Sequence, residues 1–569
     1  MRLVSVRGLT CLSTLALSLA CASSPNTNSP GSSAAGSNAG GNAAGGESGS
    51  STVAGAGAGP VSNGGASAAG SGGSSASAAG NAGNAGMPGA AGQAGAASDP
   101  GVEEPVAGLP TLGTASVDET KPGLTVPDNF SGLSLEWSTG LSYLSDGQGN
   151  AMPATIGLFK NFEADGHRID LRIGGNSTDK TWWTAGPGTR PAAQVDSVDS
   201  SFLSTFSSIY NQTGALFILG VDLAVNDTTN PASFVKAAQT AMPAGSITAF
   251  EIGNEPDLYS SNGWRSASYG FSDYQKDVDA YITALAPLVT PEPLLTMPAF
   301  AGTGWFTQTK AILSAQKAKL TFATLHNYPF SICGKATTDS SYPKLSDLLT
   351  DKGTSNVENT YAPLISATNA LGLGLRMAEF NSIACGGAPG VSDTFAQALW
   401  SIDVLFRFAE SGALGVNFHT SGDYPAFRYT NGALDVLPLY YGMLMFSLGT
   451  AEKGQLIPVQ VQSTGRVRAF ATLGSDGAVR LVAINEDPSA TGKLTITLSK
   501  AHGVARISRL TAPMLSSKNG LSFENQTFDG STDGKPVGTR TRNFVTPSGT
   551  SYAFGLPPDS AATLVIPAL

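Results

Sequence analysis

Short apolar runs alternate with amphipathic segments at roughly forty-residue intervals from Phe130 onward. The runs that we expect to form strands span 132–138, 167–175, 215–223, 246–254, 293–300, 320–328, 373–381 and 413–421. They are apolar nearly throughout, which is typical of strands buried on both faces of a parallel sheet.

Segments with helical spacing of apolar residues lie between these runs, for example 155–166, 231–242, 274–289 and 393–412. Eight βα units across about 310 residues favour a closed (β/α)8 TIM barrel over an open doubly wound sheet. No GxGxxG follows the first strand, which argues against a dinucleotide-binding domain. The predicted fold class is therefore α/β, with a catalytic barrel over residues 106–449.

The pattern changes at about residue 450, where apolar and polar residues begin to alternate and the connections become rich in turn residues. Such alternation predicts an antiparallel β-sandwich over residues 450–569. The strand-like segment 109–127 precedes the first barrel strand and is a candidate to pair with this sandwich.

An export signal is predicted at the N-terminus. Arg2 and Arg7 precede an apolar run that is too short to span a bilayer, and this run ends in small residues before Cys21. This arrangement resembles a bacterial lipoprotein signal, in which Cys21 is lipidated and anchors the protein to the outer membrane or cell surface. The alternative is an ordinary secretory signal and a secreted protein.

Residues 22–105 are rich in Gly, Ala, Ser and Asn, and Glu47 is their only charge before Asp99. No aromatic residue precedes Phe130, so this part of the chain cannot form an apolar core and is expected to be a disordered tether. The whole chain of 569 residues has a formal net charge of −10. This acidity disfavours nucleic acid and anionic membranes as partners, which leaves the lipid anchor as the expected membrane contact. Its oligomeric state is left open.

Two of the four cysteines remain once Cys11 has left with the signal and Cys21 has become the lipid anchor: Cys333 and Cys385. In an exported protein, two remaining cysteines predict a disulfide. Neither has a CxxC partner or a nearby histidine, so metal binding is the weaker interpretation.

Polar residues follow several of the predicted barrel strands, which is where TIM barrels carry their active sites. Glu255 ends the fourth strand and Glu379 the seventh, and these two strands face each other across the mouth of a closed barrel. A pair of carboxyl groups, one protonated and one ionised, is the minimum equipment for hydrolysing a glycosidic bond. A separation of about 5 Å gives retention of configuration, whereas a wider gap admits a water molecule and gives inversion.

The motifs EIGNEPD and RMAEFN look like those of the clan A retaining glycoside hydrolases. Together with GLSLEWS, LRIGGNSTDKTWW and AEFNSIACGG, they resemble glycoside hydrolase family 79, which contains β-glucuronidases and heparanase-like enzymes. The similarity extends over about residues 125–569, the sandwich included.

This resemblance implies that Glu255 is the general acid/base and Glu379 the nucleophile. It further implies that Asn254 hydrogen-bonds the sugar 2-hydroxyl, and that Tyr328 donates to the nucleophile and keeps it ionised.

Three more residues are expected near the sugar. Glu136 and Asn176 match positions that hold sugar hydroxyls, while Asp179 either does the same or caps a following helix. His326 and His419 are expected to hydrogen-bond in the pocket floor, because the chemistry of this clan needs neither a metal nor a cofactor.

The expected activity is that of a retaining exo-β-glucuronidase, which removes terminal β-linked glucuronic acid. No run rich in Lys or Arg surrounds the barrel, so an endo-acting enzyme of the heparanase or hyaluronan type is the less favoured alternative. An alternative from another class is a surface lipoprotein that binds carbohydrate without cleaving it.

Overall fold

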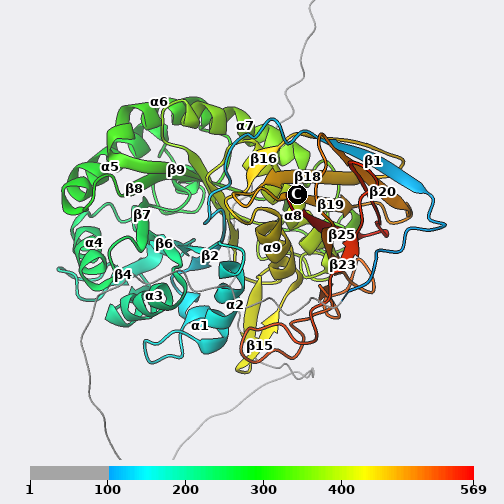
Figure 1. Cartoon of the computed structure of the whole chain (residues 1–569). Coiled ribbons are helices and arrows are strands. Elements are labelled where there is room, and N and C mark those ends of the chain that lie inside the picture. The colour runs from blue at the N-terminus through cyan, green and yellow to red at the C-terminus, as the bar shows by residue number, and fades with distance from the viewer. Residues whose placement is uncertain (1–100) are drawn as a thin grey trace, which may run out of the picture. The chain divides into compact units, whose positions relative to one another are not determined.

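The computed structural model describes residues 101–569, in which eight parallel strands close into a barrel (Figure 1). In the order in which they neighbour one another, they are β2 (Ser131–Glu136), β3 (Asp170–Gly174), β6 (Leu216–Val221), β7 (Ile247–Ile252), β8 (Leu295–Phe300), β9 (Leu320–Asn327), β11 (Leu375–Phe380) and β13 (Gly415–His419). Each strand coincides with one of the eight predicted runs, which confirms the predicted (β/α)8 barrel.

Helices surround the strands because each buries one apolar face. In α5, for instance, the buried residues Tyr274, Val278, Tyr281 and Leu285 recur at helical spacing. The helices are α1 (Gly140–Leu144), α2 (Pro153–Glu163), α3 (Ser200–Thr213), α4 (Thr229–Ala241), α5 (Phe271–Leu285), α6 (Phe306–Gln316), α7 (Ser355–Asn369), α8 (Phe395–Glu410) and α9 (Pro438–Gly449).

Short strands and 3₁₀ turns lie in the loops between the barrel strands and the helices. The short strands are β4 (Thr181–Trp183), β5 (Asp196–Val198), β10 (Phe330–Ser331), β12 (Ile383–Ala384), β14 (Phe427–Thr430) and β15 (Ala433–Val436). The 3₁₀ turns are η1 (Thr178–Lys180), η2 (Pro256–Leu258), η3 (Ala286–Leu288), η4 (Lys317–Lys319) and η5 (Leu345–Asp347).

The barrel register aligns polar side chains near the carboxyl ends of the strands. Glu379 on β11 pairs with His326 on β9, and His419 on β13 pairs with Ser134 on β2. Residues far apart in the sequence therefore lie at similar depths along neighbouring strands.

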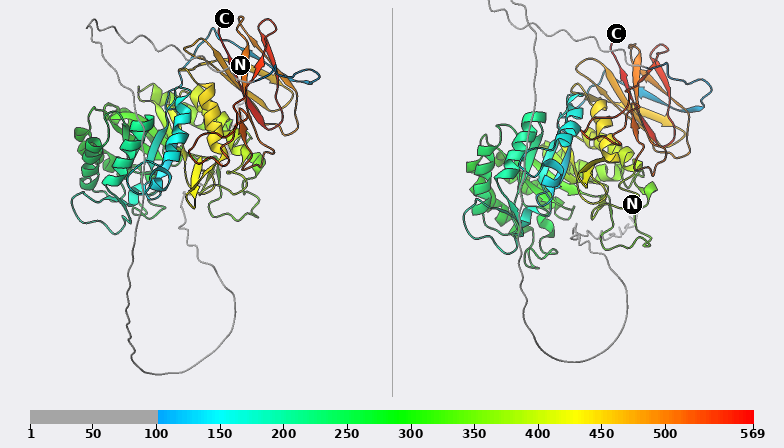
Figure 2. Two further views of the ribbon diagram at one scale, coloured as in Figure 1. Left: turned by 60° about the horizontal axis from the view of Figure 1, so that its bottom comes forward. Right: turned by 90° about the horizontal axis from the view of Figure 1, so that it is seen from below.

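Two sheets form the C-terminal sandwich (Figure 2). One contains β17 (Val459–Ser463), β1 (Thr111–Val117), β20 (Lys493–Leu498) and β24 (Ser551–Gly555). The other contains β16 (Gln455–Ile457), β18 (Val467–Leu473), β19 (Val479–Asn485), β25 (Ser560–Ile566), β21 (Ala505–Thr511), β22 (Ser522–Phe523) and β23 (Asn543–Val545). The early strand β1, blue in Figure 2, lies between β17 and β20, so the segment ahead of the barrel is part of the sandwich.

The last five residues of the expected linker, 101–105, pack on the sandwich. The Glu104 backbone N–H donates to the carbonyl of Phe544 at 2.8 Å, and its carboxylate forms an ion pair with Arg509. The carboxylate of Glu104 therefore has a partner on the sandwich. The signal segment, Cys21 and the rest of the linker lie outside the described residues. Between residues 101 and 569, no helix has the length and apolar character needed to cross a membrane.

The barrel and the sandwich share an apolar interface. Phe406 of α8 stacks on Phe470 of β18 with ring centroids 4.8 Å apart, and Phe446 of α9 lies 4.9 Å from Phe406. All residues of α9 are buried. A helix that is buried on every side has no amphipathic pattern.

A disulfide joins Cys333 and Cys385. It lies just beyond the pairing of β10 with β12, in the loops that follow β9 and β11. These loops begin next to Tyr328 and Glu379, so the disulfide ties together two chain segments at the mouth of the barrel.

Candidate active site

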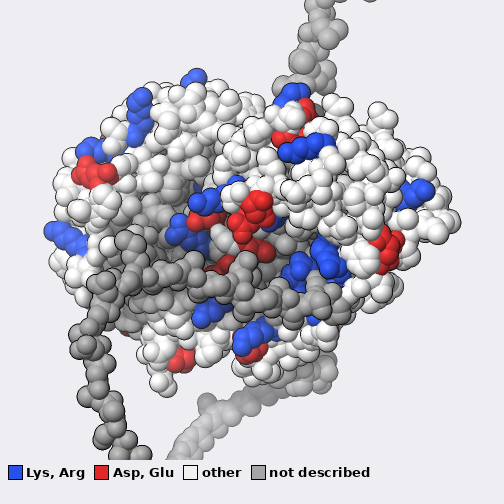
Figure 3. Space-filling view, in the orientation of Figure 1, with Lys and Arg blue, Asp and Glu red and all other residues white. Residues whose placement is uncertain are grey.

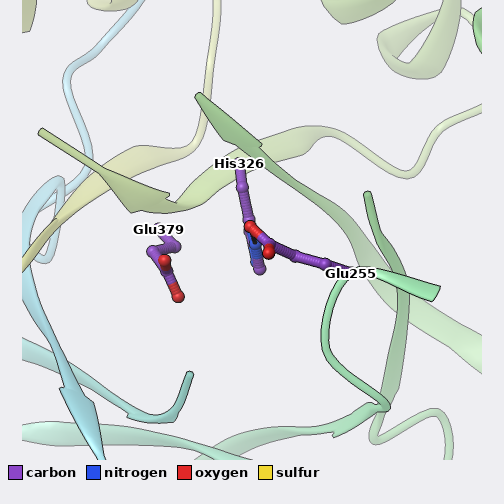
Figure 4. Close-up of side chains that lie close together, drawn as sticks. All are labelled: Glu255, His326 and Glu379. Carbon is purple, nitrogen blue, oxygen red and sulfur yellow. Dashed lines mark hydrogen bonds and ion pairs between the residues drawn. The ribbon is translucent and has the colours of Figure 1, made fainter. Parts of the chain in front are cut away.

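Glu255 and Glu379 meet at the carboxyl ends of β7 and β11 (Figure 4). One carboxylate oxygen of each, together with a ring nitrogen of His326, lies within 4.8 Å of the others. Glu255 has a left-handed backbone, with φ 52° and ψ 52°, and its N–H donates to the carbonyl of Ala299 at 2.9 Å. Both side chains are almost fully buried. The structure thus brings together the two glutamates that the sequence placed on opposite strands.

Arg172 of β3 lies at the centre of the site and is fully buried. Its Nη1 donates to Glu379 Oε2 at 2.6 Å, and its Nη2 forms an ion pair with Glu251 Oε2 at 2.6 Å. The same Nη2 donates to Asn254 Oδ1 at 2.8 Å. The planar guanidinium of Arg172 therefore holds Glu379 through one nitrogen and Asn254, the neighbour of Glu255, through another.

Glu379 is held in its ionised form. Burial opposes ionisation, but His419, Arg172 and the hydrogen bond from Tyr328 outweigh it and lower the pKa of Glu379 to about 2. The hydroxyl of Tyr328 donates to Glu379 Oε1 at 2.9 Å, at the position that the sequence predicted for it.

His326 is a neutral ring, because burial and the nearby Arg172 lower its pKa to about 3. Arg172, by contrast, is a permanent cation and forms a direct ion pair with Glu379. Arg172 Nη2 lies 3.3 Å from His326 Nε2 and can only donate, so Nε2 accepts and Nδ1 carries the proton. Nδ1 lies 3.2 Å from Glu255 Oε1 and donates to it.

Glu255 is held in its protonated form. Burial raises the pKa of Glu255 well above its usual range, and the negative charge of Glu379 raises it further. Its Oε2 is buried and has no hydrogen-bond partner among residues 101–569. Because Oε1 accepts from His326, Oε2 is the oxygen left to carry a transferable proton. The two glutamates thus have opposite protonation states, as an acid and a nucleophile require.

Glu136 and Asn176 lie together beside this pair. The Asn176 backbone N–H donates to Glu136 Oε1 at 3.1 Å, and the Ser177 N–H donates to Oε2 at 2.7 Å. His419 Nε2 lies 3.7 Å from Glu136 Oε1. Gly175 adopts φ 70°, and a side chain there would collide with the Glu136 carboxylate, so glycine is required.

Asp179 does not occupy the position expected of it. Its carboxylate is buried, and both oxygens accept hydrogen bonds from the chain itself, namely from the loops that follow β6 and β7. Its backbone partners therefore belong to these two loops and not to the N-terminus of a following helix.

A metal ion would fit the spacing of Glu255, His326 and Glu379. However, Arg172 donates to Glu379 and contacts His326, so a cation among these ligands would be repelled by the guanidinium. The donor set fits proton transfer better than metal binding.

Two central residues, Arg172 and Glu251, were not predicted as site residues. Both are charged and stand inside strands whose residues are nearly all buried. A charged side chain within a buried strand needs a charged or polar partner. The two charges in these strands could therefore have indicated that Arg172 and Glu251 belong to the site.

Comparisons with known proteins place this geometry among glycosidases. A β-glucuronidase of Neurospora crassa is 26% identical over 441 residues, covering 67% of this chain and 76% of that protein. A β-glucuronidase of Aspergillus niger is 26% identical over 300 residues, covering 46% of this chain and 52% of that protein. Among solved structures, a 4-O-α-L-rhamnosyl-β-D-glucuronidase of Fusarium oxysporum in complex with Rha-GlcA has a TM-score of 0.65 at 20% identity, covering 82% of this chain and 99% of that one. No protein-family model matches the chain.

The comparisons confirm the resemblance to β-glucuronidases that the motifs predicted, and with it the prediction of a glycoside hydrolase. The likeness to the solved structure shows the fold alone. Because one fold hosts many activities, the sugar and the mechanism have to be argued from the site.

Proposed function

We propose that the protein is a retaining exo-β-glucuronidase that removes terminal β-linked glucuronic acid by double displacement. The observation that carries this proposal is the pair Glu255 and Glu379, with carboxylate oxygens within 4.8 Å and pKa values shifted in opposite directions. Inverting enzymes need a gap of about 6.5–9.5 Å for a water molecule, so the short separation supports retention.

In the first step, ionised Glu379 attacks the anomeric carbon while Glu255 Oε2 gives its proton to the departing glycosidic oxygen. The product is a glycosyl ester on Glu379. Esterification removes the negative charge that had raised the pKa of Glu255, so this pKa falls. Glu255 can then take a proton from water, which attacks the ester and regenerates Glu379.

Arg172 and Tyr328 support this cycle by stabilising Glu379 as a carboxylate before attack and as a leaving group afterwards. Asn254 is held by Arg172 beside Glu255, where its amide is available to the sugar 2-hydroxyl. Glu136 and Asn176 lie within the same rim as candidate ligands of the sugar hydroxyls.

The similarity to two fungal β-glucuronidases supports a glucuronide as the substrate. The acidity of the chain supports exo action, because a long polyanion would be repelled. On the face shown in Figure 3, charged side chains are sparse, and the basic ones are scattered rather than gathered in a continuous track.

The catalytic assignment is tested with Glu379→Ala and an aryl β-glucuronide. We expect kcat to fall by about five orders of magnitude, since removal of a nucleophile abolishes its covalent step. Azide should restore part of the activity and yield a glycosyl azide of inverted configuration. Glu163→Ala, which removes an exposed glutamate, serves as the control. Unchanged turnover in Glu379→Ala would refute Glu379 as the nucleophile, whereas the absence of turnover in the wild-type protein would favour the alternative of a carbohydrate-binding protein.

The substrate assignment is tested with aryl glycosides that differ only at C6. The glucuronide should be hydrolysed fastest, and equal rates on the glucoside would refute the uronate claim. Exo action is tested on oligosaccharides with either a terminal or an internal glucuronate. Cleavage at the internal residue would instead indicate an endo-acting enzyme.

We also propose that the protein is exported and anchored through Cys21, which the signal-like sequence before it supports. In a bacterial host, Cys21→Ser should move the protein from the membrane fraction to the soluble fraction. An unchanged distribution would favour the secreted alternative or another anchor.

A further inference from the structure

One buried carboxylate connects the carboxyl ends of three neighbouring barrel strands, β3, β6 and β7. Asp179, which follows β3, is 2% exposed. Its Oδ1 accepts the backbone N–H of Leu223 at 3.0 Å and that of Ala224 at 3.2 Å, both just beyond β6. Its Oδ2 accepts the N–H of Asn254 at 3.2 Å and the hydroxyl of Tyr259 at 2.8 Å, both beyond β7.

The turn after β7 depends on such ties because its backbone is strained. Gly253 adopts φ 75° and Glu255 φ 52°, so left-handed residues flank Asn254 on both sides. Two successive N–H groups fix this turn: that of Asn254 donates to Asp179, and that of Glu255 donates to Ala299 on β8. Asp179 thus holds the residue directly before the acid/base candidate.

A second buried carboxyl, Asp222, lies beside Asp179. Two neighbouring buried carboxylates repel each other when both are ionised, so one of the two carries a proton. Asp179 accepts four other donors and is the better site for the charge. Asp222 accepts from Gln194 Nε2 at 3.1 Å and from the Val225 N–H at 3.3 Å, which leaves it as the protonated partner. In agreement, burial and then the negative charge of Asp179 raise the pKa of Asp222 well above its usual range.

We propose that Asp179 is a positioning residue that holds the 253–255 turn, and with it Glu255 Oε2, in the geometry needed to protonate the leaving group, with Asp222 as its proton-donating partner. The inference rests on the proposed function. It adds to that function a residue that touches neither the sugar nor the reacting atoms.

The test compares Asp179→Asn with wild type on two glucuronides. In the variant an NH₂ group replaces one accepting oxygen and opposes N–H donors, so the turn should shift. For an alkyl glucuronide, whose leaving group needs protonation, kcat/KM should fall about 100-fold, as is typical when a catalytic group is misplaced by about 1 Å. For a dinitrophenyl glucuronide, whose leaving group needs no acid, kcat/KM should fall much less.

Asp222→Asn provides the matched comparison. Its amide can still donate to Asp179 as the protonated carboxyl did, so the loss on the alkyl glucuronide should be about ten times smaller than that of Asp179→Asn. Tyr259→Phe removes a single donor to Asp179 and should show the same dependence on leaving group in weaker form. If Asp179→Asn does not fold, Tyr259→Phe provides the test in its place. Asp227→Asn, an exposed change in the same loop, is the control.

The inference is overturned if Asp179→Asn or Tyr259→Phe slows both substrates equally, as general destabilisation would. It is also overturned if Asp222→Asn is as damaging as Asp179→Asn. A failure of the proposed function looks different, because the wild-type chain would then cleave neither glucuronide.

Discussion

The barrel mouth and the interface between barrel and sandwich both pair arginines with carboxylates, but only in the mouth is the arginine fully buried. In the mouth, Arg172 contacts Glu379 at the carboxyl ends of the strands. At the interface, Arg466 of the sandwich pairs with Asp351 and with Glu486, each at 2.8 Å.

Both regions shift pKa values. Burial, followed by the negative charge of Asp403, raises the pKa of Glu486 to about 8 although two arginines oppose the shift. A shifted pKa therefore does not by itself mark an active site, because structural ion networks produce it as well. The difference is that the mouth places two carboxyls of opposite protonation state side by side at the ends of barrel strands, whereas the interface joins two domains. Mutations in the mouth should change activity, whereas those at the interface should change stability and leave activity in place.

The largest effect is expected for Arg172→Lys. A single ammonium cannot contact Glu251, Glu379 and Asn254 at once, so kcat/KM should fall about 1000-fold and folding should lose about 3–5 kcal/mol from the unpaired buried charge. Steady-state kinetics and urea unfolding measure the two losses. Arg168→Lys, at an exposed ion pair, is the control. Near wild-type turnover in Arg172→Lys would remove Arg172 from the site.

A smaller effect is expected for Tyr328→Phe. Glu379 loses a donor at 2.9 Å, and a hydrogen bond to a charged group is worth about 1.5–3 kcal/mol, so kcat/KM should fall about 10- to 100-fold. The same loss raises the pKa of Glu379 from about 2, so the acid limb of the pH–kcat/KM profile should move to higher pH. Tyr210→Phe, away from the mouth, should leave this limb in place. A Tyr328→Phe profile identical to wild type would contradict the contact.

The smallest effect on activity is expected for Glu486→Gln. The folded-state pKa of Glu486 is about 8 against an ordinary value of 4.5, so the folded protein binds the extra proton between these values. The stabilisation from this group is complete below pH 4.5 and is lost as the pH rises through 8. Glu486→Gln should keep its activity and flatten the decrease in thermal stability over this window, whereas Glu163→Gln should not. A loss of activity as large as in Tyr328→Phe would break the distinction between the two regions.

The sequence predicted the barrel well because each strand is a separate apolar run. It also predicted Glu255, Glu379 and Tyr328 at the mouth, because parallel strands of a closed barrel end at one rim. The sequence could not predict which side chains of different strands contact each other inside the barrel. Arg172 on β3 and Glu251 on β7 are separated by β6, and their pairing follows from the fold rather than from any local motif.

Asp179 is a second example in which the sequence predicted the location of a residue but not its contacts. Its place after β3 predicted a residue near the site, which is correct, but not that its carboxylate turns inward to the loops after β6 and β7. The helix α9 lacks the periodicity by which helices are recognised in a sequence, because it is buried on all sides. Local pattern identified the elements and the rim, whereas the contacts between distant segments required the fold.

The most direct test of the double-displacement mechanism is to trap its covalent intermediate. A 2-deoxy-2-fluoro-β-glucuronyl donor with a good leaving group should inactivate the enzyme and add one sugar per chain. Peptide mapping by mass spectrometry should then place this sugar on Glu379. A label on Glu255 or Glu136, or turnover with inversion and no label at all, would contradict the mechanism proposed here.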